Sequence, residues 1–291
     1  MTNVHEHYSV QYTKNYIDGN VYAVTGATSG FGKEVALEIL KMGGKVVING
    51  RREEAVNAVL EEAAALGKAD NIAAVTGDVS DYATSVNMVK LAAEKFGKLD
   101  AFVANAGTMP LATFHHHAEA LPAWEKCIDI NLKGNLYGIC ASYDQFKAQG
   151  YGHFLTVSSI HGNFPTAGGG VYAATKVGIR YMAHALMNEC HGLVKVSVIR
   201  PTGVSGTGLM ATVVNGEGSD GIFGNNRART IANRGALANG EHPEFGDPED
   251  IGYIGLKTEE LVWGIMFALN QPRGVNVGDV TMHATNEDHI L

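Results

Sequence analysis

Positive charge is in short supply along this chain. Its 291 residues include 22 lysines and arginines against 30 aspartates and glutamates, so the formal net charge is −8 at pH 7. Nucleic acids and anionic membrane surfaces attract proteins with a basic footprint, which this composition does not provide. We therefore expect no DNA, RNA or membrane partner, and we expect the negative charge to serve solubility.

Cysteine is also rare. Cys127, Cys140 and Cys190 are odd in number and widely spaced, and they form no Cys-x-x-Cys pair. This pattern favours free thiols in a reducing compartment over a disulfide framework or a zinc site. No run approaches the roughly 18 apolar residues of a membrane helix, and residues 1–19 lack the apolar core of a secretory signal. We therefore expect a cytoplasmic protein.

The chain does contain a regular alternation of short β-branched runs and longer helical patterns. The runs predict strands at residues 21–24, 45–48, 72–75, 99–103, 154–157, 194–199 and 275–282. The patterns between them predict helices at residues 33–42, 53–66, 82–96, 123–146, 172–190 and 258–269. Strands that alternate with helices form βαβ units, so we expect an α/β fold whose parallel sheet is covered on both faces.

One stretch interrupts this alternation. Residues 202–250 are rich in Gly, Asn, Thr and Arg and show weak periodicity. A loop of that length inside a compact domain is usually a lid or a mobile segment. We therefore expect an N-terminal extension at residues 1–19 and a single domain at residues 20–291, with a substrate lid inserted at about 202–250.

The first predicted strand runs into a glycine-rich turn, Thr25-Gly26-Ala27-Thr28-Ser29-Gly30-Phe31-Gly32. A bound diphosphate needs a backbone without side chains where the chain passes it, together with free N–H groups and the positive end of a helix. The spacing G-x3-G-x-G differs from the commoner G-x-G-x-x-G, and a tight turn without a ligand is the alternative. The residues that we expect to contact a dinucleotide here are Gly26, Thr28, Ser29, Gly30, Phe31 and Gly32.

The end of the second predicted strand indicates which dinucleotide is used. An acidic side chain about 20 residues past the glycines would accept the ribose 2′-hydroxyl of NAD, whereas this chain has Asn49-Gly50-Arg51-Arg52 there. Guanidinium groups pair well with a phosphate dianion, so Arg51 and Arg52 favour NADP(H), with NAD as the less favoured cofactor. The alternative is that both arginines are solvated at the start of a helix.

Two shorter motifs follow the next two strands. Asp78-Val79 follows the third strand, where the Asp78 carboxylate can reach an adenine amine. Asn105-Ala106-Gly107 ends the fourth strand with small residues that let the strand edge lie against a cofactor. Neither motif is specific by itself.

A tyrosine, a lysine and a serine form the predicted catalytic group. Tyr172 and Lys176 lie four residues apart in a predicted helix and share one face, while Ser158 and Ser159 close the fifth strand. Carbonyl reduction needs a proton donor beside the oxygen, and a serine hydroxyl can orient that oxygen. An ammonium favours a nearby phenolate, so we expect Lys176 to lower the pKa of Tyr172. A lone Tyr-x3-Lys pair is otherwise an ordinary helix surface.

Taken together and in this order, TGATSGFG, NAG, SSI and YAATK resemble the signature motifs of the short-chain dehydrogenase/reductase family, from about residue 20 to the end of the chain. The resemblance implies a doubly wound Rossmann-type sheet of about seven parallel strands flanked by helices, and a homodimer or homotetramer. It also implies hydride transfer between a nicotinamide cofactor and an alcohol or carbonyl carbon.

The resemblance also assigns residues. The family's catalytic serine stands thirteen residues before its tyrosine, which selects Ser159 over Ser158. Asn131 is implied to orient a water in a proton relay with Lys176. The implied catalytic set is Asn131, Ser159, Tyr172 and Lys176, of which we expect Tyr172 and Lys176 to contact the cofactor as well.

The chain departs from the family after the sixth predicted strand, where the family usually has Pro-Gly and this chain has Pro201-Thr202-Gly203-Val204. We expect Pro201 and Val204 to contact the cofactor, with the Val204 backbone at its carboxamide. The segment Pro272–Val277, followed by Thr281, is similar to a branch of the family that acts on 3-hydroxy acids and other small alcohols with NADP.

A substrate pocket is expected near the catalytic group, because His161 lies two residues past Ser159. The residues expected to line this pocket are Met109, His161 and Phe164.

Two further clusters carry side chains that often bind ligands. His115, His116 and His117 are adjacent and cannot all point at one metal from a helix or strand, so we expect a solvated loop and no metal. The lid contains Arg227, Arg229 and Arg234, which can bind an anionic substrate group or form a solvated basic stretch.

The sequence therefore predicts an NADP(H)-dependent oxidoreductase that interconverts a secondary alcohol and a ketone or aldehyde, with Tyr172 as general acid/base. An NAD-using dehydrogenase of the same family is one alternative. An epimerase or dehydratase with tightly held NAD and a non-catalytic dinucleotide-binding protein are two others on the same fold. The absence of an acid near Arg51 argues against the epimerase or dehydratase. The intact catalytic set argues against the non-catalytic protein.

Overall fold

The strands of the computed structural model, which describes residues 14–287, form one sheet. They are β1 Val21–Val24, β2 Lys45–Gly50, β3 Ile72–Thr76, β4 Ala101–Ala104, β5 Gly152–Val157, β6 Val194–Pro201 and β7 Asp279–Met282. All seven are parallel, in the order β3-β2-β1-β4-β5-β6-β7. The order reverses between β1 and β4, which places a ligand crevice at the carboxyl ends of these two strands. The predicted Rossmann-type fold is confirmed.

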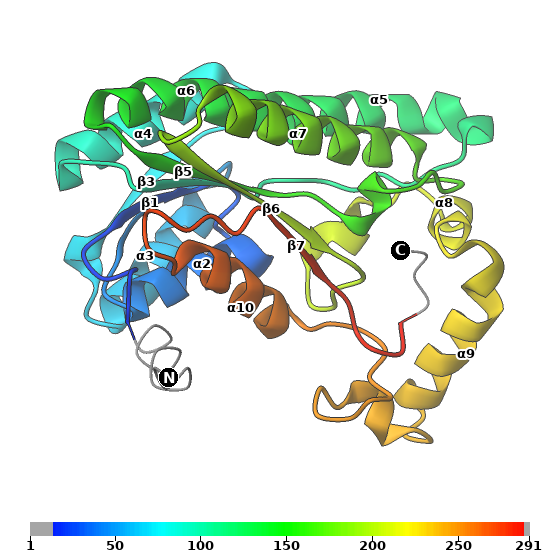
Figure 1. Cartoon of the computed structure of the whole chain (residues 1–291). Helices are drawn as coiled ribbons and strands as arrows, with labels where there is room; N and C mark the ends of the chain where they lie inside the picture. The colour runs from blue at the N-terminus through cyan, green and yellow to red at the C-terminus, as the bar shows by residue number, and fades with distance from the viewer. Residues whose placement is uncertain (1–13, 288–291) are drawn as a thin grey trace, which may run out of the picture.

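Helices cover both faces of this sheet (Figure 1). One layer contains α2 Gly30–Lys41, α3 Glu53–Ala65 and α10 Thr258–Leu269. The other contains α4 Tyr82–Phe96, α5 His117–Cys127, α6 Gly134–Gln149 and α7 Gly170–Glu189. Each layer packs its apolar side chains against the sheet in a core of its own. The central strands β1, β4 and β5 are buried along their whole length, as a doubly covered parallel sheet requires.

The helix predicted at residues 123–146 is divided. A π-helical turn, Ile128–Lys133, separates α5 from α6. Such turns insert an extra residue into a helix and occur frequently at functional sites. The apolar spacing on either side remains helical, so the hydrophobic pattern gave no sign of the insertion.

The last strand is shorter than the predicted residues 275–282 and begins at Asp279. Val275 donates its N–H to Pro272 O in a turn, at 3.0 Å. Asn276 uses its side-chain oxygen, not its backbone, to accept from Val196 N at 3.1 Å. The segment before Asp279 therefore bonds to β6 partly through the side chain of Asn276, so β7 starts only at Asp279.

The stretch at residues 202–250 is more regular than predicted. It contains the short helix α8 Gly216–Gly221 and the longer helix α9 Arg227–Ala238. No residue of α9 is fully buried, and it lies in a stretch rich in Gly, Asn, Thr and Arg, so the sequence pattern indicates a polar loop there. Figure 1 shows α9 standing away from the sheet, beside the segment that follows β7.

The expected extension is only partly described, because residues 1–13 lie outside the described residues. Ile17, which belongs to it, is fully buried in the core beneath α2 and α10. All three cysteines are free, with Cys127 and Cys190 buried and Cys140 exposed. Within residues 14–287, no helix is both long and apolar enough to cross a membrane.

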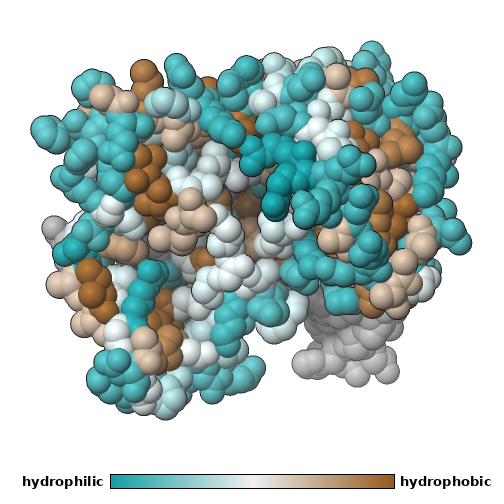
Figure 2. Space-filling model, turned by 180° about the vertical axis from the view of Figure 1, so that it is seen from behind, coloured by the Kyte–Doolittle hydropathy of each residue, from teal (hydrophilic) through white to brown (hydrophobic). Residues whose placement is uncertain are grey.

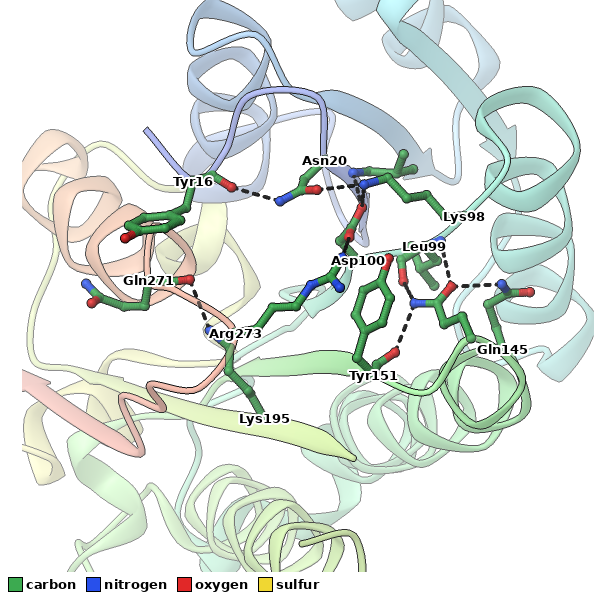
Figure 3. A network of polar contacts seen from close by, with 12 residues as sticks. Tyr16, Asn20, Lys98, Leu99, Asp100, Gln145, Tyr151, Lys195, Gln271 and Arg273 are labelled. Atoms are coloured by element: carbon green, nitrogen blue, oxygen red, sulfur yellow. Dashed lines mark hydrogen bonds and ion pairs between the residues drawn. The ribbon is translucent and has the colours of Figure 1, made fainter. Parts of the chain in front are cut away.

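A polar network joins the amino ends of the strands, at the end of the sheet opposite the crevice (Figure 3). Asp100, just before β4, accepts from Val21 N at 2.8 Å and forms an ion pair with Lys98 at 2.8 Å. Arg273 lies 3.9 Å from the same carboxylate, with its guanidinium 3.6 Å from the centroid of the Tyr151 ring. The starts of β1 and β4 are thereby joined to the segment that leads into β7.

Candidate functional site

A cavity of about 1000 Å3 opens at the carboxyl ends of the strands. It runs from the glycine turn after β1, past the ends of β4, β5 and β6, to the lid. The predicted site residues that line it are Gly26, Thr28, Ser29, Gly30, Phe31, Arg51, Asp78, Val79, Asn105, Ala106, Gly107, Met109, Ser159, His161, Tyr172, Lys176, Pro201 and Val204. Those that do not line it are Gly32, Arg52, Asn131 and Phe164.

The glycine turn packs tightly against the end of β4. Gly26 has a φ of +63°, and a Cβ there would lie 2.9 Å from Ala106 Cα. A Cβ on Gly32 would lie 2.4 Å from the Asn105 amide nitrogen, which donates to Gly26 O at 3.3 Å. Gly32 therefore serves packing, while Gly30 opens α2 at the cavity wall, where backbone N–H groups can face a phosphate.

Two polar residues that the sequence did not single out hold this end of the cavity together. The Thr25 hydroxyl accepts from Asn105 N at 3.0 Å and from Ala106 N at 3.1 Å. Asn49 is buried and donates to the carbonyls of Val75 and Gly77 at 3.1 and 3.0 Å, which fixes the end of β3 beside β2. Both positions lie in motifs quoted from the sequence, but the role of their side chains does not follow from those motifs, because the hydrogen bonds join residues 26 or more positions apart.

Arg51 is the guanidinium available to a phosphate at the cavity. Its side chain is 56% exposed and lies 4.0 Å from Asp78. Arg52 is the N-cap of α3 and does not reach the cavity. Burial opposes ionisation of Asp78, but hydrogen bonds from Ser80 and the charge of Arg51 outweigh it, so the pKa of Asp78 lies below its usual value.

The predicted catalytic group is buried in the wall of the cavity. Tyr172 and Lys176 lie on α7, and each is 5% exposed. The Lys176 ammonium donates to Val157 O at 2.7 Å and lies 5.7 Å from the centroid of the Tyr172 ring. The Ser159 hydroxyl accepts from His161 N at 3.2 Å and is hydrogen bonded to Tyr172.

The pKa of Tyr172 is not lowered as the sequence led us to expect. Burial raises it to about 12, against the opposing effect of the Ser159 hydrogen bond. Burial likewise lowers the pKa of Lys176 to about 8. Because desolvation disfavours both charged forms, Tyr172 is a protonated donor at neutral pH, and Lys176 stays charged only up to mildly alkaline pH.

Asn131 lies in the π-helical turn and is fully buried. Its side-chain oxygen accepts from Thr108 N at 2.9 Å, and its amide nitrogen donates to Thr108 O at 2.9 Å and to Thr175 Oγ1 at 3.1 Å. These contacts tie the loop after β4 to α7 beneath Tyr172. Ser158, the serine not selected, donates to the backbone of Lys176 at 2.9 Å.

The loop after β6 accommodates its additional residue through contacts with distant segments. Thr202 donates its backbone N–H to Met282 O at 3.1 Å, and Val204 forms a bridge with Leu256. The Glu287 carboxylate accepts from the Thr202 hydroxyl and from Gly203 N. Glu287 could not be predicted from the sequence, because it is more than 80 positions from this loop and belongs to no motif.

The lid provides the far wall of the cavity. Of its three arginines, Arg234 lines the cavity and lies 5.2 Å from the centroid of the Phe223 ring. Arg227 is paired with Asp220, and Arg229 donates to Asn286 at 3.2 Å. The lid residues that line the cavity without having been predicted include Phe223, Leu237 and Phe245.

The three adjacent histidines do not converge. His116 forms an ion-pair contact with Glu217 at 3.2 Å, and His117 contacts Phe114 O at 3.2 Å. Across the part of the chain that the structure describes, no group of three or more potential ligands could hold a metal ion.

Comparison with known proteins identifies the class. A sequence profile described as short chain dehydrogenase matches residues 20–218, and the chain belongs to this family of oxidoreductases. An uncharacterized oxidoreductase of Listeria monocytogenes is 32% identical over 275 residues, which cover 93% of this chain and 98% of the relative. The NADP-dependent 3-hydroxy acid dehydrogenase YdfG of Salmonella typhi is 32% identical over 263 residues, covering 90% and 94%.

Solved structures agree with this membership. The closed form of serine dehydrogenase complexed with NADP+ matches with a TM-score of 0.70 and 26% identity, covering 90% of this chain and 94% of that one. An alcohol dehydrogenase from the archaeon Thermococcus sibiricus, complexed with 5-hydroxy-NADP, matches with a TM-score of 0.73 and 20% identity, covering 94% and 99%. The latter is a likeness of fold alone.

Proposed function

We propose that this protein is an NADP(H)-dependent oxidoreductase that interconverts a secondary alcohol and a ketone or aldehyde, with Tyr172 as general acid/base. The observation that carries the proposal is the buried group of Ser159, Tyr172 and Lys176 in the same cavity as the glycine turn. The names of its NADP-dependent relatives support it.

The residues present fit a dinucleotide. The Gly26 turn leaves the cavity wall without a side chain, and Arg51 offers an exposed guanidinium to a 2′-phosphate. NADPH, when bound, supplies the hydride of the reduction. We infer NADP(H) over NAD because the segment that would supply a carboxylate for the 2′-hydroxyl, Asn49-Gly50-Arg51-Arg52, contains no acid and presents Arg51 at the cavity.

The side chains of the site account for the proton. In the reduction direction, the Tyr172 hydroxyl donates its proton to the carbonyl oxygen of the substrate, which the Ser159 hydroxyl orients. The Lys176 ammonium stabilises the phenolate that this transfer leaves, since opposite charges in a buried site attract strongly. Asn131 holds the loop after β4 against α7 and so fixes the position of Tyr172 during the proton transfer. The lid helix α9 excludes water from the far side of the cavity.

The substrate that we propose is a small hydroxy acid. Relatives are named for 3-hydroxy acids and for serine, which carry a carboxylate. On the lid side of the cavity, Arg234 presents a guanidinium among the aromatic residues Phe223 and Phe245, and Arg–carboxylate pairs are among the strong polar contacts.

We also propose that residues 20–291 form one domain, with a substrate lid at about 202–250.

We also propose a cytoplasmic homodimer or homotetramer. Free thiols fit a reducing compartment. Trp263 and Phe267 lie one helical turn apart on α10 and are 66% and 49% exposed, so α10 presents two adjacent large apolar side chains at the surface. The space-filling view shows similar separate apolar groups on a mostly hydrophilic surface (Figure 2).

Replacing the proton donor tests the reaction. Tyr172→Phe is expected to lower kcat by about two orders of magnitude or more, the usual contribution of a general acid. The measurement is NADPH oxidation with a panel of ketones and keto acids. Tyr181→Phe, on the exposed side of the same helix, serves as the matched control and should retain wild-type kcat. Near-wild-type turnover of Tyr172→Phe would exclude the assigned role.

Removing a guanidinium tests the cofactor. Arg51→Ala is expected to lower kcat/KM for NADPH by about 10- to 100-fold, as for the loss of a charge-assisted hydrogen bond, and to change the value for NADH by less than about threefold. Arg52→Ala is the comparison, because Arg52 does not line the cavity. A larger effect of Arg52→Ala would mean that Arg52, and not Arg51, binds the 2′-phosphate. A wild-type preference for NADH would overturn the cofactor assignment.

A matched acid and ester test the substrate class. Arg234→Gln is expected to raise KM for a 3-hydroxy acid about tenfold and to leave KM for its methyl ester within about twofold, since the ester has no charge to lose. Arg227→Gln is the control, because its guanidinium is already paired with Asp220. Equal effects of Arg234→Gln on acid and ester would rule out a carboxylate contact.

Light scattering tests the assembly. The wild-type protein at micromolar concentration is expected to have two or four times the mass of one chain. Trp263→Glu should reduce that mass, because it introduces a charge into an apolar contact. A wild-type monomer would contradict the proposed assembly.

A further inference from the structure

The loop that leaves β6 is held by a carboxylate from the other end of the domain. Glu287 Oε2 accepts from the Thr202 hydroxyl at 2.5 Å, and Glu287 Oε1 accepts from Gly203 N at 3.0 Å. Ala284 N also donates to Oε2, at 3.3 Å, and closes the segment on itself. Both oxygens of one side chain therefore bind two successive residues of a cavity-lining loop.

The fit between this carboxylate and the loop leaves little freedom. A Cβ on Gly203 would lie 2.8 Å from Glu287 Oε1, so a side chain at this position would displace the carboxylate. Further along the loop, Ser205 N donates to Leu256 O at 2.8 Å, beside the bridge between Val204 and Leu256. The four residues 202–205 are thus held by two segments that are distant from them in sequence.

The segment that carries Glu287 is itself anchored to the lid. It follows β7 and passes beside α9, as Figure 1 shows in red. Asn286 donates from its side chain to Gly252 O at 3.2 Å and accepts from Arg229 on α9 at 3.2 Å. The Arg234 guanidinium lies 3.8 Å from the Cβ position of Gly203, on the same side as Glu287. Residues 284–287 therefore join the lid to the loop after β6.

We propose that Glu287 is a positioning residue whose carboxylate holds Thr202 and Gly203 in the conformation that receives the nicotinamide end of NADP(H). This inference rests on the proposed function, because it requires NADP(H) to bind in the cavity. Glu287 acts through the loop, since its oxygens are engaged by Thr202 and Gly203. The adenine end, at the glycine turn and Arg51, lies on the other side of the cavity and does not depend on it.

Two ligands that differ only at the nicotinamide end test this inference. NADPH contains the nicotinamide nucleotide, whereas 2′-phospho-ADP-ribose lacks the nicotinamide ring. Glu287→Gln is expected to raise Kd for NADPH about tenfold, the effect of losing hydrogen bonds to a charged acceptor, and to leave Kd for 2′-phospho-ADP-ribose within about twofold. Fluorescence titration and calorimetry give the two values, and the thermal midpoint should stay close to wild type.

Thr202→Val provides a second variant that removes one donor and keeps the carboxylate. Thr202→Val should raise Kd for NADPH by part of the factor seen in Glu287→Gln. The double variant should lose less binding free energy for NADPH than the two single variants added together, because the two residues share one hydrogen bond. Glu241→Gln is the control: it changes an exposed carboxylate in the lid that does not line the cavity.

Several results would overturn the inference. They are an unchanged Kd for NADPH in both variants, equal weakening of both ligands, and full additivity of the two substitutions. If the wild-type protein binds 2′-phospho-ADP-ribose but shows no NADP-dependent turnover, the proposed function is wrong. The Kd values of the Glu287→Gln variant would still test the role of Glu287 in that case. A wild-type protein that binds neither ligand would reject both.

Discussion

The contact between the glycine turn after β1 and the end of β4 supports the rest of the site. Asn105 and Ala106 occupy the space that side chains at Gly32 and Gly26 would fill, and Thr25 accepts hydrogen bonds from both. This contact exists because β1 and β4 are neighbours at the point where the strand order reverses. The cavity wall at the glycine turn and the loop toward Asn131 both start from it, so the proposed chemistry depends on one packing interaction between two buried strands.

Most of the fold could be predicted because its signals are local. The helices at residues 82–96 and 258–269 have the predicted bounds, since each carries a strong apolar face and a clear start. The π-helical turn at residues 128–133 and the lid helix α9 could not be predicted. The first leaves the helical spacing intact on both sides, and the second is so polar that its sequence resembles the loop around it.

The candidate site was predictable where residue type and order carry the information. The glycine turn and the Ser159, Tyr172 and Lys176 group meet in one cavity. The sequence could not give the direction of the pKa of Tyr172, because burial depends on the packing of the whole cavity wall. Glu287 was equally hidden, since its contact with Thr202 joins residues 85 positions apart.

The polar network around Asp100 has a consequence for how this protein can change. It joins the starts of β1 and β4 to the segment before β7, at the edge of the sheet opposite the cavity. The ion pairs and hydrogen bonds of this network and the cavity where we propose that small molecules bind therefore lie at opposite ends of the same strands. Substitutions in the lid can therefore change specificity while the hydrogen bonds and ion pairs around Asp100 stay intact. In protein engineering, the lid is the part to vary and the Asp100 network is the part to keep.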